Sequence, residues 1–225
     1  MHPDRREFLG RLTAGSALAA GLNFVPGLDA DLVAMVQPPA DGFDLTWFDR
    51  VKGTHRAVFD CTEIESGAGV LRAVLWKSQY AQFLKVAPDD MTAVVVIRHS
   101  AIPLAMKQEY WDRYHVGRKN KVKHPFTDKD TDRNPAMLTV DHGDLPAPMG
   151  GLNIDGVLKS GGIVLACNLA FGDIVSAVAK EEKLEPAAAR TQALTMLHPG
   201  ILLQPSGVFG TLRAQEARCA YIKAS

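Results

Sequence analysis

The sequence predicts an α/β fold, a three-layer α/β/α sandwich around a mostly parallel sheet of about five strands. Short β-branched segments alternate along the chain with longer segments whose apolar residues recur at helical spacing. The segment Ala93–Ile97 is apolar without interruption, which is typical of a strand buried on both faces of a parallel sheet.

The first half of the domain favours a strand, a helix and a second strand in that order. Residues 55–61 form a short strand candidate, and residues 67–84 carry apolar side chains at helical spacing. Residues 91–99 contain the uninterrupted apolar run, so we expect a central strand there. After Pro103, residues 104–114 favour a helix.

The second half repeats this alternation. Residues 162–167, 200–204 and 220–222 are strand candidates, and we expect helices at 169–182, 184–197 and 208–217. Ser206 is suited to cap the last of these helices.

Between the two halves lies a long polar segment, residues 117–150. It contains prolines and has neither hydrophobic period. We expect it to be a loop insertion outside the core, of the kind that forms lids or disordered excursions.

The N-terminus has the pattern of a twin-arginine export signal. Arg5 and Arg6 precede Phe8 and an apolar run of small residues. At about 14 residues this run is shorter than the roughly 20 that span a bilayer. We therefore expect a signal peptide at 1–34, a linker at 35–42, one domain at 43–225 and a periplasmic location. No ideal cleavage site follows the run, so an uncleaved membrane anchor is the alternative.

The composition disfavours several classes of partner and cofactor. The chain has 25 basic and 25 acidic residues, so we expect neither nucleic acid nor an anionic membrane as a partner. The seven histidines are scattered without metal-ligand spacing, so we expect no metal. Neither a glycine-rich dinucleotide fingerprint nor a nucleophilic serine elbow is present, and we expect no cofactor.

Three predicted strands end in residues that can carry chemistry: Asp60-Cys61, Arg98-His99 and Cys167-Asn168. Carboxyl ends of parallel strands meet at one edge, where α/β proteins bind ligands. Cys167 directly precedes a predicted helix, whose amides favour a reactive thiolate, so we predict it as the catalytic nucleophile.

The neighbours of Cys167 have predicted roles as well. We predict His99 as its base, with Arg98 and Asn168 binding substrate. The alternatives are a buried Cys167 that serves as a small hydrophobe and a His99 that only caps a strand. A redox pair of Cys61 and Cys167 stays open at this stage. Cys219 precedes the last strand at the opposite edge, and we expect it to be structural.

The chain resembles the DsrE/DsrF-like family of small α/β proteins associated with sulfur relay. The resemblance covers residues 44–222 and is most specific in Gly161–Asn168, in Gln204–Phe209 and in Arg213–Glu216, with Arg98–Leu104 as a further shared segment. It implies that Cys167 carries sulfur as a persulfide, that the partners are sulfur donor or acceptor proteins, and that the protein forms a homo-oligomer. The export signal and the 117–150 insertion depart from that pattern.

Two functions from different classes follow from these observations. The first is binding or transfer of sulfane sulfur through Cys167, and the second is a non-catalytic module that binds a small ligand at the strand edge. The surroundings of Cys167 distinguish them, because a sulfur wholly buried without polar neighbours would remove the physical basis of relay chemistry.

Overall fold

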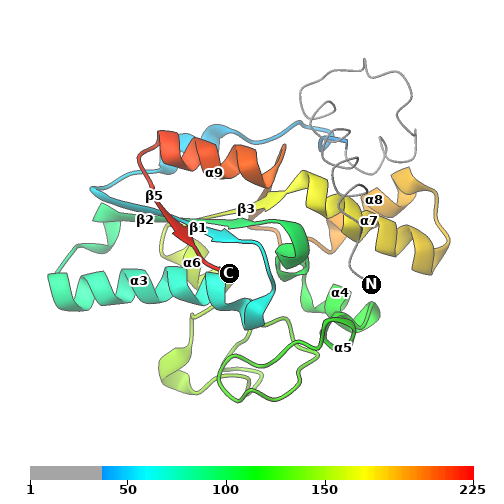
Figure 1. The fold of residues 1–225 in the computed structure, drawn as a ribbon, viewed down its shortest axis with the longest axis horizontal. Coiled ribbons are helices and arrows are strands. Elements are labelled where there is room, and N and C mark those ends of the chain that lie inside the picture. Colours follow the sequence, from blue (N-terminus) through cyan, green and yellow to red (C-terminus); the bar gives the residue numbers. More distant parts are fainter. Residues whose placement is uncertain (1–36) are drawn as a thin grey trace.

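The computed structural model describes residues 37–225, so the expected signal with Arg5 and Arg6 lies outside the described part of the chain. Five parallel strands form one sheet in the order β4-β3-β2-β1-β5 (Figure 1). The strands are β1 (His55–Cys61), β2 (Met91–Ile97), β3 (Ile163–Cys167), β4 (Ile201–Gln204) and β5 (Ala220–Lys223). The predicted α/β fold class and its parallel sheet are confirmed.

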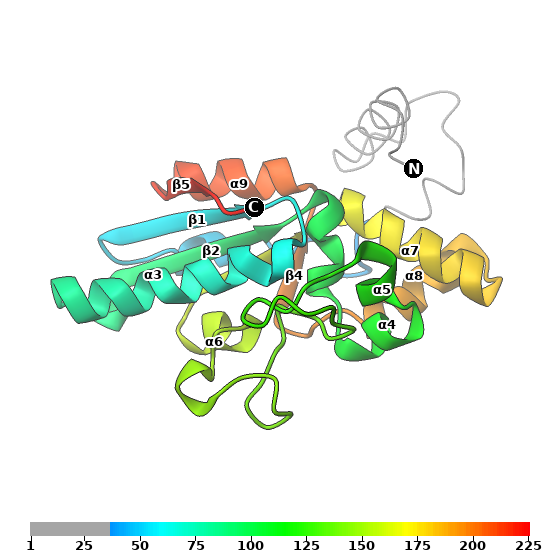
Figure 2. The ribbon, with the colours of Figure 1, turned by 60° about the horizontal axis from the view of Figure 1, so that its bottom comes forward.

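Helices cover both faces of the sheet. On one face lie α3 (Ala68–Leu84) and α6 (Ile154–Lys159), and on the other lies α9 (Gly207–Glu216) (Figures 1 and 2). The helices α7 (Asn168–Glu182) and α8 (Pro186–Thr195) pack against each other and extend beyond the carboxyl end of β3 (Figure 1). The molecule is therefore layered as helix, sheet and helix.

The central strand β2 separates two apolar clusters. Its side chains alternate, so Val95 and Ile97 join the cluster on the α3 face, whereas Val94 and Val96 join the cluster under α9. All residues of β2 are buried, as the uninterrupted apolar run indicated. Two buried faces are what a parallel sheet covered by helices requires.

The expected helix over 104–114 is wrong in its bounds. The chain instead forms the 3-10 helix η4 (His99–Ala105) and then, after a break, α4 (Gln108–Arg113). Met106 between them is extended and forms an antiparallel bridge with Leu197. This pairing with a distant residue interrupts the helix. The spacing of apolar residues predicts a helix from local sequence alone and does not reveal such tertiary contacts.

Short elements complete the described chain. They are the 3-10 helices η1 (Thr46–Arg50), η2 (Glu65–Gly67), η3 (Pro88–Asp90) and η5 (Ala147–Met149), together with α5 (Val116–Asn120). Helix α6 was not expected from the sequence, because six residues are too few to establish a helical period. Its start is fixed by Asn153, whose side chain accepts a hydrogen bond from the Gly156 amide at 2.8 Å.

Residues 117–150 are mostly irregular, but they are anchored to the core and do not lie outside it. Val122 and Ala136 belong to the apolar cluster on the α3 face. The buried Asn134 side chain donates hydrogen bonds to the carbonyl oxygens of Leu104, at 3.0 Å, and Met106, at 2.7 Å. The expectation of an excursion outside the core is therefore wrong for these anchoring residues, since spaced apolar residues in a loop carry no periodic signal.

Limited trypsin digestion should distinguish the anchored from the exposed parts of this segment. Lys129 is exposed and has no regular structure, whereas Lys77 is buried in α3 and Arg98 is held by hydrogen bonds at the end of β2. We expect the first cut within residues 43–225 to follow Lys129, because a protease needs a locally open chain. Mass spectrometry of the first fragments measures this, and a first cut at Lys77 or Arg98 would contradict the described packing.

Candidate functional site

The predicted site residues lie at the carboxyl ends of the strands, where the connections that follow β3 and β4 run to opposite faces of the sheet. After β3 the chain enters α7, whose buried Phe171 joins the cluster on the α3 face, whereas after β4 it enters α9, whose Ala214 joins the opposite cluster. Neighbouring strands with connections to opposite faces leave a switch point at their carboxyl ends, the usual ligand position in open α/β sheets. Cys167 pairs with Gln204 in register at this point.

Cys167 is the N-cap of α7. Its Sγ atom accepts a hydrogen bond from the Ala170 amide at 3.4 Å, and the amides of Leu169 and Gly207 also contribute hydrogen bonds to it. Gly207 opens α9, so amides from the first turns of two helices face one sulfur atom. Ser206 caps α9 by accepting from the Phe209 amide at 3.0 Å, as the sequence predicted.

Burial and polar contacts act on the Cys167 thiol in opposite directions. Burial raises its pKa, and this effect outweighs the three amide hydrogen bonds and the charge of Arg98, all of which lower the pKa. The expectation that the helix start would lower the pKa of Cys167 overall is therefore wrong, although the amides act as expected. The residue is 7% exposed, so it is neither wholly buried nor without polar neighbours.

A buried ion pair stands beside this sulfur. Arg98, which follows β2, donates from Nε and Nη2 to the two carboxylate oxygens of Asp60 at 2.6 and 2.7 Å. Tyr221 of β5 donates its hydroxyl to Asp60 Oδ2 at 2.8 Å. The contact with Arg98 holds the pKa of Asp60 below its usual range despite the burial of that carboxylate, which is 1% exposed.

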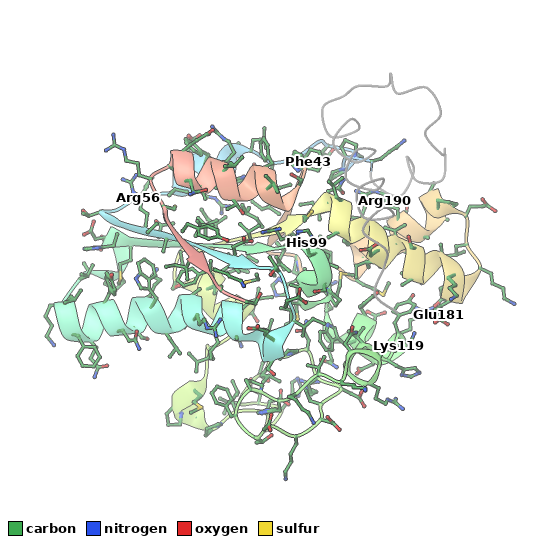
Figure 3. All side chains as sticks on the ribbon, viewed as in Figure 1. Phe43, Arg56, His99, Lys119, Glu181 and Arg190 are labelled. Atoms are coloured by element: carbon green, nitrogen blue, oxygen red, sulfur yellow. The ribbon has the colours of Figure 1, made fainter. Side chains whose placement is uncertain are left out.

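His99 and Asn168 each lie close to a cation, Arg98 and Arg190 respectively. Burial together with the Arg98 charge lowers the pKa of His99. The buried Asn168 accepts from Arg190 Nη2 at 2.7 Å. Figure 3 shows His99 after β2, and Arg190 on α8. The roles of His99 and Asn168 stay predictions.

The open question of a Cys61–Cys167 pair has a geometric answer. Cys61 is in register with Ile97, and Ile97 is in register with Ala166, so β2 separates the two cysteines. Two strand spacings amount to about 10 Å, more than the roughly 7 Å between Cα atoms that a disulfide spans. These two residues cannot form a direct disulfide in this fold, and both are free thiols.

The other two thiols, Cys61 and Cys219, are in surroundings that disfavour their ionisation. Burial raises the pKa of Cys61 to about 12, with a further increase from Asp60. Cys219 precedes β5 at the amino end of the sheet, opposite Cys167, and burial raises its pKa to about 11. The Cys61 sulfur packs against Gly69 in the first turn of α3, but within residues 37–225 no backbone amide hydrogen bond contributes to lowering the pKa of Cys61 or of Cys219.

Two residues of this cluster were missed by sequence reasoning. Tyr221 lies in the last strand and Gly207 directly follows the cap of α9. A phenol in a predicted edge strand and a glycine after a capping serine were the only local signals. Both positions depend on the strand order, which places β5 with Tyr221 beside β1, and places β4, which precedes Gly207, beside β3.

Comparison with protein-family models, with curated proteins and with solved structures finds no match to this chain. Among residues 37–225, no three histidine, cysteine or acidic side chains are grouped so that they could hold a metal ion. In the same part of the chain, no helix is both long and apolar enough to cross a membrane. The class of protein defined here is thus a parallel α/β domain with a cysteine at its switch point.

Proposed function

We propose that this protein binds and transfers sulfane sulfur on Cys167, as the resemblance to DsrE/DsrF-like relay proteins implies. One observation carries the proposal: the Cys167 sulfur lies at the switch point, faces the amides of Leu169, Ala170 and Gly207, and has the Arg98 guanidinium as its charged neighbour. Amides and a cation together stabilise an anionic sulfur.

The chemistry needs no external oxidant or reductant. The Cys167 thiolate attacks the terminal sulfur of a donor persulfide or polysulfide, and a new S–S bond forms at Sγ. The S–S bond of the donor breaks, and its electron pair leaves with the donor thiolate. An acceptor thiolate then attacks the persulfide on Cys167 in the same way, which returns Cys167 to its thiolate form.

The raised pKa of Cys167 is compatible with a carrier role. At neutral pH the resting residue is mainly a thiol, which resists oxidation better than a thiolate does. The small thiolate fraction limits the rate, while the neighbouring amides and Arg98 are ready to stabilise the charge that develops on sulfur. The substrate-binding role predicted for Arg98 is part of this proposal, and the charge of Arg98 next to Cys167 supports it.

We further propose that the protein acts in the periplasm and exchanges sulfur with a partner protein that presents a reactive thiol. The Arg5–Arg6 pair and the apolar run behind it support export. A homo-oligomer remains part of this proposal because the resemblance implies one.

A second function is favoured by a specific observation. Cys167 is 7% exposed and burial raises its pKa, which is the behaviour of a structural thiol in a module that binds a ligand without transferring sulfur. This alternative predicts that no sulfur is taken up.

Mass spectrometry after exposure to inorganic polysulfide tests the proposal. Cleavage after lysine and arginine places the three cysteines in separate peptides, residues 57–72, 160–180 and 219–223. Without reductant, and with alkylation to trap persulfides, we expect sulfur mass on peptide 160–180. An unmodified 160–180 peptide under conditions that load a free-cysteine control would favour the non-catalytic module.

A further inference from the structure

Asp60 is a buried carboxylate on a different strand from Cys167. It lies near the carboxyl end of β1, and β2 separates it from β3, which carries Cys167. Its two oxygens are occupied by the Arg98 guanidinium and the Tyr221 hydroxyl. A paired charge in the interior costs desolvation and is weak evidence for stability alone, so its geometry calls for another explanation.

Arg98 is constrained on both sides. Its guanidinium is held in a bidentate pair, and its aliphatic stem lies so close to Gly207 that a Cβ atom added there would be 2.4 Å from Arg98 Cδ. The same Gly207 contributes an amide hydrogen bond to Cys167. The stem of Arg98 and the sulfur of Cys167 are therefore neighbours of one backbone position.

We propose that Asp60 is a positioning residue: with Tyr221 as its second partner, it holds the Arg98 guanidinium beside the Cys167 sulfur. A bidentate pair fixes both the distance and the plane of a guanidinium, which a single contact does not. This inference rests on the proposed function, because it assigns Asp60 the task of stabilising the anionic sulfur through Arg98.

The charged groups at the carboxyl end of the sheet allow a test of this proposal, because two explanations predict opposite changes in the pKa of Cys167. Those groups are Asp60, Glu63, Arg98 and the titratable His99, with Tyr221 at the edge strand and Arg190 bonded to Asn168 beside Cys167. Removing the negative charge of Asp60 would by itself favour a thiolate at Cys167, because like charges repel. Releasing Arg98 has the opposite effect. A lower pKa of Cys167 would therefore indicate a direct effect of the Asp60 charge, whereas a higher pKa would indicate that Asp60 positions Arg98.

The experiment measures the rate of alkylation of Cys167 by iodoacetamide as a function of pH, read from peptide 160–180. For Asp60→Asn we expect a higher pKa of Cys167 and alkylation about tenfold slower at neutral pH, equivalent to about one pKa unit. For Tyr221→Phe, which removes one hydrogen bond, we expect a decrease in the same direction of about threefold. A rate that rises or is unchanged in Asp60→Asn overturns the proposal.

A double-mutant cycle shows whether Asp60 acts through Arg98. Arg98→Gln should slow alkylation as well, and Asp60→Asn in that background should cause no further decrease. Additive decreases would show that Asp60 acts independently and would overturn the positioning role. The matched control is Asp144→Asn, which breaks another bidentate pair, with Arg133 at 3.2 and 3.1 Å, in the 117–150 segment and should leave the pKa of Cys167 unchanged.

Two further measurements keep the result interpretable. Thermal unfolding establishes that each variant is folded; if Asp60→Asn does not fold, Tyr221→Phe decides, and an unchanged alkylation rate there overturns the proposal. Sulfur uptake by the wild-type protein is measured separately. A wild type that takes up no sulfur refutes the proposed function, whereas the effect of Asp60 on the Cys167 thiolate is read from alkylation alone.

Discussion

Replacement of Cys167 by serine should abolish the uptake of sulfur from polysulfide by the folded protein. The remaining thiols have pKa values of about 12 for Cys61 and about 11 for Cys219, so almost none of either is thiolate at neutral pH. Cys61 is also fully buried. Whole-protein mass spectrometry after polysulfide treatment measures the loss, with Cys219→Ser as the matched control that should take up sulfur like the wild type.

The same reasoning predicts the order in which limiting iodoacetamide modifies the three thiols. Cys167 should react first, because its sulfur alone combines partial exposure with amide hydrogen bonds and the charge of Arg98. Its raised pKa means that the rate should increase about tenfold for each pH unit above neutrality until the thiol is ionised. A Cys167 that reacts no faster than Cys219 and takes up no sulfur would refute the carrier function.

Substitution of both Arg5 and Arg6 by lysine should trap the protein in the cytoplasm. The twin-arginine route recognises the arginine pair itself and moves folded cargo, so lysine keeps the positive charge but removes the recognised feature. Cell fractionation followed by immunoblotting measures the effect. Arg11→Lys changes an arginine outside the pair and is the matched control, which should be exported normally; undiminished periplasmic yield of the double variant would count against the signal.

Much of the fold follows from local patterns in the chain. Short apolar segments predicted all five strands, with His55–Cys61 matching at both ends. The prediction was strongest for the interior strands β2 and β3, which are buried on both faces, whereas β5 is an exposed edge strand. Ser206 was identified as a cap from its side chain and position. The break in the helix predicted over 104–114 and the anchoring of 117–150 were missed, since both depend on contacts with residues distant in the sequence.

The candidate site, like the fold, was partly predictable from local sequence and partly decided by tertiary contacts. By itself the sequence determined that Asp60, Arg98 and Cys167 end neighbouring strands, because parallel strands bring their carboxyl ends to one edge. Only the tertiary structure decided that Asp60 pairs with Arg98 and Tyr221, since β5 joins the sheet beside β1 after crossing from β4. It also decided the pKa of Cys167, because that value depends on how much water the packed helices exclude, and no local pattern encodes this.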